Sequence, residues 1–160
     1  QDWQQKPSAA AISVAKIRWS HQPQLAGLKH LNRLEQVLAA RERFKVNVDE
    51  LIMLDGESLV ISTVSGNLFA VIDDVLQTPR LNQCGIEGTR RRLIIEKWSQ
   101  KVGIETRELD LDMHLLQNST ELFFCNSIVG LRPISSLGGR VWPTHPICDA
   151  LHEVYCGENR

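Results

Sequence analysis

The chain has 160 residues, of which 42% are hydrophobic and 23% are charged, and its formal net charge is −1. This length predicts a single domain that can bury a sizeable core. A net charge so close to zero gives no electrostatic basis for binding nucleic acid or a membrane surface. No apolar run approaches the length of roughly 20 residues that spans a bilayer.

The cysteine and histidine patterns argue against a metal centre. The four cysteines form no CxxC pair, and the histidines lack metal-ligand spacing. We therefore predict neither a zinc site nor a disulfide framework, and we expect reduced thiols in a cytoplasmic protein. The short apolar run at 9–14 has no basic leader, so it does not indicate a signal peptide. The cysteines are Cys84, Cys125, Cys148 and Cys156.

The first predicted elements are a strand and an amphipathic helix. A strand is expected over 10–18, followed by a connector over 19–24 and a helix from about residue 31 to residue 44. The apolar residues of this helix recur at three- and four-residue steps and share one face, while its charges mark the solvated face. The apolar positions are Leu31, Leu34, Val37 and Leu38, and the charged ones are Arg33, Glu35, Arg41, Glu42 and Arg43.

Short strands joined by tight turns follow, and they predict an antiparallel or mixed sheet rather than repeated βαβ units. These strands are expected over 50–54, 59–61, 67–72 and 75–78. A second long helix is expected from the segment 85–89 to Gly103, a residue type that often ends helices. The remaining predicted elements are a strand over 104–109, a short helix over 110–117, strands over 121–128 and 140–142, and a helix over 146–155.

Lys29 is the first candidate for chemistry. Leu25, Leu28 and Leu31 flank it, and desolvation in such an apolar setting lowers the pKa of a lysine and frees its amine for Schiff-base formation. Gly27 can bring the backbone close to a ligand. The alternative is an ordinary solvated lysine near the start of a helix.

The segment Gly85-Ile-Glu-Gly-Thr-Arg-Arg is the second candidate. It enters the second long helix, where glycine permits close approach of the backbone and free amides attract an anion. A phosphate cradle fits this pattern. A purely structural glycine-rich helix entry fits it as well.

The run 26–36, together with three later segments, closely resembles the 4-amino-4-deoxychorismate lyases, which are pyridoxal-phosphate enzymes of fold type IV. Branched-chain and D-amino acid aminotransferases share that fold. The resemblance extends from about Ile12 to Val154 and is also specific at 78–85. It implies an α+β fold with a barrel-like mixed or antiparallel sheet and flanking helices, which is the larger, C-terminal domain of the family. It also implies that Lys29 carries pyridoxal phosphate as an internal aldimine.

Further cofactor contacts are implied by the resemblance alone. The segment 85–91 is similar to the phosphate segment of the family. Gly88 would therefore allow the phosphate to come close to the backbone, and the amides of Thr89 and Arg90 would hold it. The run 124–134 resembles a second phosphate and substrate loop, which places Asn126 and Ser127 near the phosphate or a substrate carboxylate. Hydrogen bonding at a strand end is the alternative for these two. The segment 62–69, similar to a family segment ending in Asn-Leu-Phe, adds Asn67 to the cofactor contacts.

Ser62 departs from the family pattern. The family usually carries a glutamate at this position, and its carboxylate pairs with the protonated pyridine nitrogen. A serine hydroxyl can hydrogen-bond that nitrogen without stabilising its positive charge. We therefore expect Ser62 to suit elimination and to handicap transamination. Degraded cofactor affinity or activity is the other interpretation.

The implied reaction converts 4-amino-4-deoxychorismate to 4-aminobenzoate and pyruvate in folate biosynthesis, with Lys29 as aldimine former and general base. An aminotransferase of the same fold is one alternative, and a non-catalytic fragment or paralogue acting as an interaction module is another. The resemblance implies a homodimer whose subunits also have an N-terminal domain, and we expect this chain to be the C-terminal domain without that part. We therefore expect the chain to need the N-terminal domain for full activity. We also expect its substrate to be a small molecule, and we expect no nucleic-acid or membrane partner.

Overall fold

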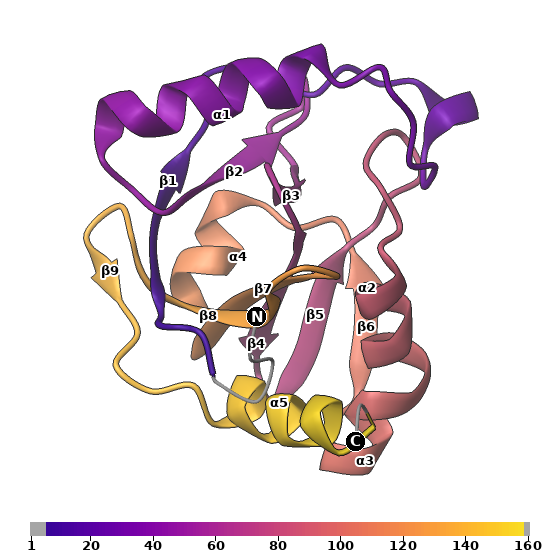
Figure 1. Cartoon of the computed structure of the whole chain (residues 1–160), viewed down its shortest axis with the longest axis vertical. Coiled ribbons are helices and arrows are strands. Elements are labelled where there is room, and N and C mark those ends of the chain that lie inside the picture. Colours follow the sequence, from indigo (N-terminus) through magenta and orange to yellow (C-terminus); the bar gives the residue numbers. More distant parts are fainter. Residues whose placement is uncertain (1–5, 159–160) are drawn as a thin grey trace.

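The computed structural model describes residues 6–158, and within them nine strands form one mixed sheet with helices around it (Figure 1). The strands are β1 (Ala10–Val14), β2 (Glu50–Leu54), β3 (Val60–Thr63), β4 (Asn67–Ile72), β5 (Val75–Pro79), β6 (Thr106–Leu109), β7 (Glu121–Asn126), β8 (Gly130–Leu137) and β9 (Arg140–Val141). The helical elements are η1 (Pro23–Leu25), α1 (Leu34–Val46), α2 (Thr89–Leu93), η2 (Ile94–Trp98), α3 (Ser99–Val102), α4 (Met113–Asn118) and α5 (Pro146–Glu158).

The sheet is curled toward a barrel. Its strand order is β3-β2-β1-β8-β7-β4-β5-β6, with β9 paired to β8. β1 runs parallel to β2 and β8, and β5 runs parallel to β6, whereas the other pairs are antiparallel. The two edges meet where the amide of Val60 donates to the carbonyl of Leu111 at 2.7 Å. The predicted fold class, a barrel-like mixed sheet with flanking helices, is therefore confirmed.

The central strands are buried on both faces, which explains their continuous apolar runs. In β4, Leu68 and Ala70 pack with α4 inside the curled sheet, while Phe69 faces the opposite cluster with Trp98 and α5. Phe69 stacks on Phe123 of β7 with ring centroids 5.2 Å apart. A strand with two buried faces fixes its register firmly, because a slip of one residue would exchange the two clusters.

The second long helix runs from Thr89 to Val102 and contains a π-helical turn over Ile94–Trp98 that the sequence did not predict. It ends, as expected, at Gly103, which has a left-handed φ of 75°. The indole of Trp98 is fully buried and donates to Glu158 Oε2 at 2.8 Å. This bond ties the helix to the end of α5.

The predicted orientation of the first long helix was wrong. Helix α1 buries Gln36 and Ala39, whereas Leu31 and Leu34 are 100% and 66% exposed. Its charged side faces the protein instead, because Glu42 accepts a hydrogen bond from the amide of Lys16 at 2.7 Å. The apolar stripe, which comprises Leu31, Leu34, Val37 and Leu38, is therefore a surface feature of this chain.

The strand β8 was missed by the sequence analysis, which treated this part of the chain as a loop. It lies between β1 and β7, and Pro133 within it is paired with Phe123. Proline lacks the N–H of a regular ladder, so its presence argued against a central strand. Strands β2 and β4 have the predicted bounds, and the other predicted elements are present with shifted ends. The short helix α4 begins after Asp112, whose side chain accepts from the amide of Leu115 at 2.8 Å.

Within residues 6–158, none of the helices combines the length and the apolar character that crossing a membrane requires.

Candidate functional site

The Lys29 segment is bound directly to the segment 85–88. The amide of Gly27 donates to the carbonyl of Gly85, and the amide of Glu87 donates to the carbonyl of Gly27, each at 3.0 Å. Gly27 has a left-handed φ of 79°, which an L side chain rarely adopts. Lys29 therefore follows, by two residues, a backbone bridge to the predicted phosphate segment.

Lys29 itself is exposed, and so are Leu28 and Leu31 beside it. The apolar surroundings on which the desolvation argument depended are thus absent from this chain. A pocket of about 460 Å³ borders the same segment and is lined in part by Leu25, His30 and Gly85. The lysine stays accessible to a ligand or to a second polypeptide.

Asn67 lies against the segment 85–88 from the side of the sheet. Its Nδ2 donates to the carbonyl of Ile86 at 2.7 Å, and its Oδ1 accepts from the amide of Gly88 at 3.1 Å. A Cβ at position 88 would collide with Asn67 Oδ1, so only glycine fits there without movement of Asn67. The predicted residues Asn67 and Gly88 are therefore in direct contact.

Thr89 and Ser127 meet across the start of the helix. Their hydroxyl oxygens are 3.2 Å apart, and both residues are exposed. The first amides of a helix have no acceptor within it, so the amides of Thr89 and Arg90 are suited to an anion. The guanidinium of Arg90 lies 4.6 Å from the ring centroid of Tyr155, so its side chain is engaged on α5.

Asn126 uses its side chain within the fold. Its Oδ1 accepts from the amides of Ile128 and Val129 at 2.9 and 2.8 Å, and its Nδ2 donates to the carbonyl of Ser65 at 3.2 Å. These are the strand-end hydrogen bonds that the sequence analysis left open as the alternative. They hold Ser127 at the turn between β7 and β8, next to Thr89.

Ser62 is 4% exposed, and its hydroxyl donates to the carbonyl of Thr63 at 2.7 Å. Ser62 lies in β3, three residues before Ser65 on the turn between β3 and β4. The carbonyl of Ser65 accepts the hydrogen bond from Asn126. Hydrogen bonds thus connect the segments of Lys29, Asn67 and Gly88 with one another, and Thr89 with Ser127, whereas the hydroxyl of Ser62 bonds to its neighbour Thr63. The roles of these residues in binding or catalysis stay predictions.

The buried thiols of Cys84 and Cys125 are poor nucleophiles. Burial, together with the nearby carboxylates of Asp55 and Glu35, raises the pKa of Cys84 to about 12. Burial likewise raises the pKa of Cys125 to about 12. Among the residues that the structure describes, no group of histidine, cysteine and acidic side chains is placed to hold a metal ion.

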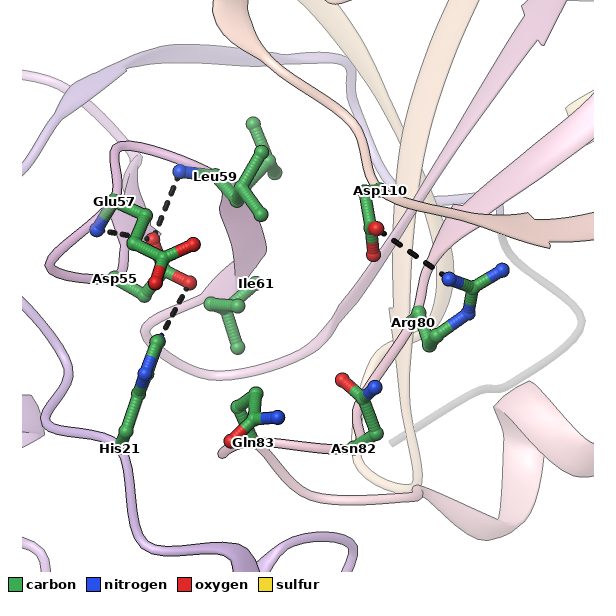
Figure 2. Close-up of a pocket in the computed structure, with 10 residues that line it drawn as sticks. His21, Asp55, Glu57, Leu59, Ile61, Arg80, Asn82, Gln83 and Asp110 are labelled. Atoms are coloured by element: carbon green, nitrogen blue, oxygen red, sulfur yellow. Dashed lines mark hydrogen bonds and ion pairs between the residues drawn. The ribbon is translucent and has the colours of Figure 1, made fainter.

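A second pocket, of about 260 Å³, contains none of the predicted site residues (Figure 2). His21 and Asp55 point toward each other on one side of it, and Arg80 and Asp110 form an ion pair on the other. The lining of this pocket also includes Glu57 and the apolar residues Leu59, Val60 and Ile61.

The connections between these residues were not predicted from the sequence. Gly27 was noted only as a possible approach point, and Asn67 only as a family position. A signal for Asn67 was available, since an asparagine directly after the tight turn at Ser65-Gly66 can hydrogen-bond a neighbouring backbone. The partner segment, Ile86 to Gly88, is about 20 residues away in sequence and could not be identified from spacing.

Comparisons with known proteins agree with this geometry. The family model for amino-transferase class IV matches residues 1–137. An aminodeoxychorismate lyase of Vibrio harveyi is 35% identical over 135 residues, which are 84% of this chain and 49% of that protein. The crystal structure of 4-amino-4-deoxychorismate lyase from Pseudomonas aeruginosa superposes with a TM-score of 0.89 at 36% identity, covering 98% of this chain and 56% of that one.

A branched-chain aminotransferase from Thermoproteus uzoniensis gives a TM-score of 0.88 at 28% identity, covering 96% of this chain and 52% of that one. The chain therefore spans about half the length of the relatives it matches. The resemblance inferred from the sequence is confirmed, and so is the fold that lyases and aminotransferases share. This chain belongs to the class IV aminotransferase family.

Proposed function

We propose that this chain is the cofactor-binding part of a pyridoxal-phosphate-dependent lyase that converts 4-amino-4-deoxychorismate to 4-aminobenzoate and pyruvate in folate biosynthesis. The observation that carries the proposal is the backbone bridge from Gly27 to the segment 85–88, because it joins the Lys29 segment to the start of the helix at Thr89. The identity of 35–36% to two lyases supports this reaction.

The groups around Thr89 fit the phosphate of such a cofactor. Amides at the start of a helix attract an anion. The hydroxyls of Thr89 and Ser127 share one hydrogen bond at 3.2 Å, so the one that accepts it keeps its own proton free to donate. Lys29 would hold the aldehyde end, while Gly88, Thr89, Arg90 and Ser127 would hold the phosphate end. When bound, pyridoxal phosphate supplies an aldehyde and an electron-withdrawing ring.

Lys29 has a second role in this proposal. Its Nζ would accept the proton from the substrate carbon next to the amine, which is general-base catalysis. Formation of the aromatic product supplies driving force, so the chain mainly needs to orient the substrate and move this proton. The exposure of Lys29 leaves its amine able to reach both partners.

Ser62 supports elimination over amino transfer. Its hydroxyl proton is donated to the carbonyl of Thr63 at 2.7 Å, so only oxygen lone pairs remain for a ring nitrogen. A neutral hydroxyl stabilises a positively charged nitrogen less than a carboxylate does. The ring is then a weaker electron sink, which disfavours transamination more than a reaction driven by aromatisation.

Product analysis tests the proposal. The chain, joined to the N-terminal domain of the enzyme and supplied with pyridoxal phosphate, should release pyruvate from 4-amino-4-deoxychorismate. Ser62→Glu should raise amino transfer to a keto acid, while Ser62→Gln, a neutral side chain of similar size, should not. Absence of pyruvate release by the unmodified protein would contradict the lyase assignment, and no rise in transfer with Ser62→Glu would contradict the role of Ser62.

The likeness to a branched-chain aminotransferase keeps amino transfer as a second candidate function. The same assay separates the two, because an aminotransferase would convert a keto acid to an amino acid without releasing pyruvate. A non-catalytic interaction module is the third candidate. A chain that binds pyridoxal phosphate at Lys29 would exclude that candidate.

The exposed apolar face of α1 supports a protein partner. Five large apolar side chains on α1 and in the segment before it are each more than half exposed, and exposed apolar surface of this kind marks an interaction site. They are Leu28, Leu31, Leu34, Val37 and Phe44. We propose that the complete enzyme covers it in a homodimer. Light scattering should show concentration-dependent dimers that the double substitution Leu31→Ser and Leu34→Ser weakens. A chain that is monomeric at all concentrations would assign the face to the N-terminal domain instead.

A further inference from the structure

Asn67 is held rigidly by its own strand. It is the first residue of β4, it is paired with Cys125 of β7, and only 7% of it is exposed. The preceding turn is closed by two bonds, from the amide of Thr63 to the carbonyl of Gly66 at 2.8 Å and from the amide of Gly66 to Thr63 Oγ1 at 2.9 Å. The backbone of Asn67 is therefore held in place, which fixes the position from which its side chain extends.

The carboxamide of Asn67 acts as both donor and acceptor toward one loop. It donates to the carbonyl of Ile86 and accepts from the amide of Gly88, at 2.7 and 3.1 Å. Aspartate of the same shape lacks the donor, and alanine lacks both groups. Only an amide side chain of this length satisfies the two backbone groups.

The other edge of the loop is held by Gly27. Its backbone binds the carbonyl of Gly85 and the amide of Glu87, both at 3.0 Å. The two partners therefore take alternate residues: Gly27 binds Gly85 and Glu87, and Asn67 binds Ile86 and Gly88. The loop is fixed between the Lys29 segment and the sheet immediately before the first helical amides.

We propose that Asn67 is a positioning residue that acts through this loop, setting where the amides of Thr89 and Arg90 meet a phosphate, and does not itself contact the cofactor. This inference rests on the proposed function. It changes the role that the family resemblance implied for Asn67, because both polar atoms of its side chain already have backbone partners. The side chain thus has its effect at the phosphate end of the ligand and not at the aldehyde end.

The consequence is a difference between two ligands. Pyridoxal phosphate uses both Lys29 and the helix start, whereas pyridoxal, which lacks the phosphate, uses Lys29 alone. In Asn67→Ala, two hydrogen bonds to the loop are lost, and we expect the affinity for pyridoxal phosphate to fall by about tenfold or more. The affinity for pyridoxal should stay within about twofold, because no bond to Lys29 is changed.

The experiment measures binding of both compounds by borohydride trapping at Lys29 over a concentration series. Thr78→Val is the matched control, since Thr78 is fully buried and donates to the carbonyl of Leu68 at 2.8 Å without touching the loop. It should lower stability and leave the ratio of the two affinities unchanged. Asn67→Asp preserves the size of the side chain and replaces Asn67→Ala in the experiment if that variant does not fold. It should shift the ratio of the affinities for pyridoxal phosphate and pyridoxal in the same direction.

Hydrogen exchange gives a readout without any ligand. Amide exchange in a peptide spanning 84–90 should be faster in Asn67→Ala than in the unmodified chain, and unchanged in Thr78→Val. Equal loss of affinity for both compounds, an unchanged ratio, or unchanged exchange in 84–90 would overturn the positioning role while leaving adduct formation at Lys29, and so the proposed function, intact. A chain that forms no adduct with either compound would overturn both.

Discussion

The Nε2 atom of His21 lies 2.8 Å from Oδ2 of Asp55, a carboxylate in a residue that is 2% exposed (Figure 2). Oδ1 of Asp55 accepts from the amides of Glu57 and Leu59, both at 2.9 Å. One buried side chain thus closes the hairpin between β2 and β3 and binds the segment that precedes η1 and Lys29. Removing it leaves two amides and an imidazole without their acceptor.

Asp55→Ala should therefore lower the free energy of unfolding by about 3 kcal/mol, since each buried group left unsatisfied costs about 1–3 kcal/mol. His21→Ala should cost less, about 1 kcal/mol, because it removes one bond from a half-buried side chain. Urea denaturation measures both. Asp110→Ala is the control: Asp110 is exposed and paired with Arg80 at 3.4 Å, and an equal cost there would contradict the account.

Glu121 predicts a pH dependence of stability. Its carboxylate accepts from the amides of Ile147 and Cys148 at the start of α5, but burial raises its pKa above the ordinary value of 4.5. The folded state then binds the proton more tightly than the unfolded state, so this group's contribution to stability falls as pH rises above about 4.5. The stability difference between the unmodified chain and Glu121→Gln should therefore shrink from pH 4 to pH 7.

Glu158→Gln is the matched control, because the contribution of Glu158 to stability should change with pH in the opposite direction. Hydrogen bonds from Lys101 and Trp98 lower the pKa of Glu158 below 4.5, so its contribution is lost as pH falls through the lowered value. Thermal unfolding between pH 3 and pH 8 measures both variants. If the stability difference between the unmodified chain and each variant changed with pH in the same direction for Glu121→Gln and Glu158→Gln, these assignments would be contradicted.

The thiols should differ sharply in reactivity. A pKa of about 12 leaves Cys84 and Cys125 almost wholly protonated at pH 8, and burial raises the pKa of Cys148 as well. Iodoacetamide should therefore modify Cys156, which is partly exposed, well before the others. Mass spectrometry follows the labelling, and the chain in urea should label at all four positions. Modification of Cys84 as fast as Cys156 would show that the core cluster that Cys84 forms with Trp19, Leu51 and Met53 opens readily.

The apolar stripe on α1 should contribute little to the stability of this chain. Leu31→Ser changes a side chain that is 100% exposed, so its effect should be within about 0.5 kcal/mol. Ala39→Leu, on the buried side of the same helix, should cost about 1–3 kcal/mol because it overpacks the contact with β2. Urea denaturation compares them. If Leu31→Ser cost as much as Ala39→Leu, the stripe would face the core after all.

This helix shows what periodicity can and cannot predict. The spacing predicted a shared helical face for Leu31, Leu34 and Leu38, but α1 begins only at Leu34, so Leu31 precedes the helix. Hydrophobicity alone does not tell whether a face packs on the chain's own core or on another polypeptide. The bounds of β2 and β4 were predicted to the residue, because continuous apolar runs end at clear turns. The strand β8 was missed because Pro133 interrupts its pattern.

The residues of the candidate site were named from resemblance, but their contacts could not be predicted from spacing. Thr89 and Ser127 are 38 positions apart and meet only because β7 ends beside the start of the helix. Ser62 and Lys29 carry no local sign of a shared function. The sequence identified the groups, whereas the proximity of Thr89 to Ser127 and of Asn67 to Gly88 follows from the folded sheet.

The central claim is that Lys29 holds pyridoxal phosphate, and borohydride reduction followed by peptide mass mapping tests it most directly. The account predicts a pyridoxyl adduct on the peptide that contains Lys29, its loss in Lys29→Ala, and its persistence in Lys45→Ala, which removes another exposed lysine. The measurement should be made on the chain alone and with the N-terminal domain restored. No adduct at Lys29 in either form, or an adduct that persists in Lys29→Ala, would contradict the account.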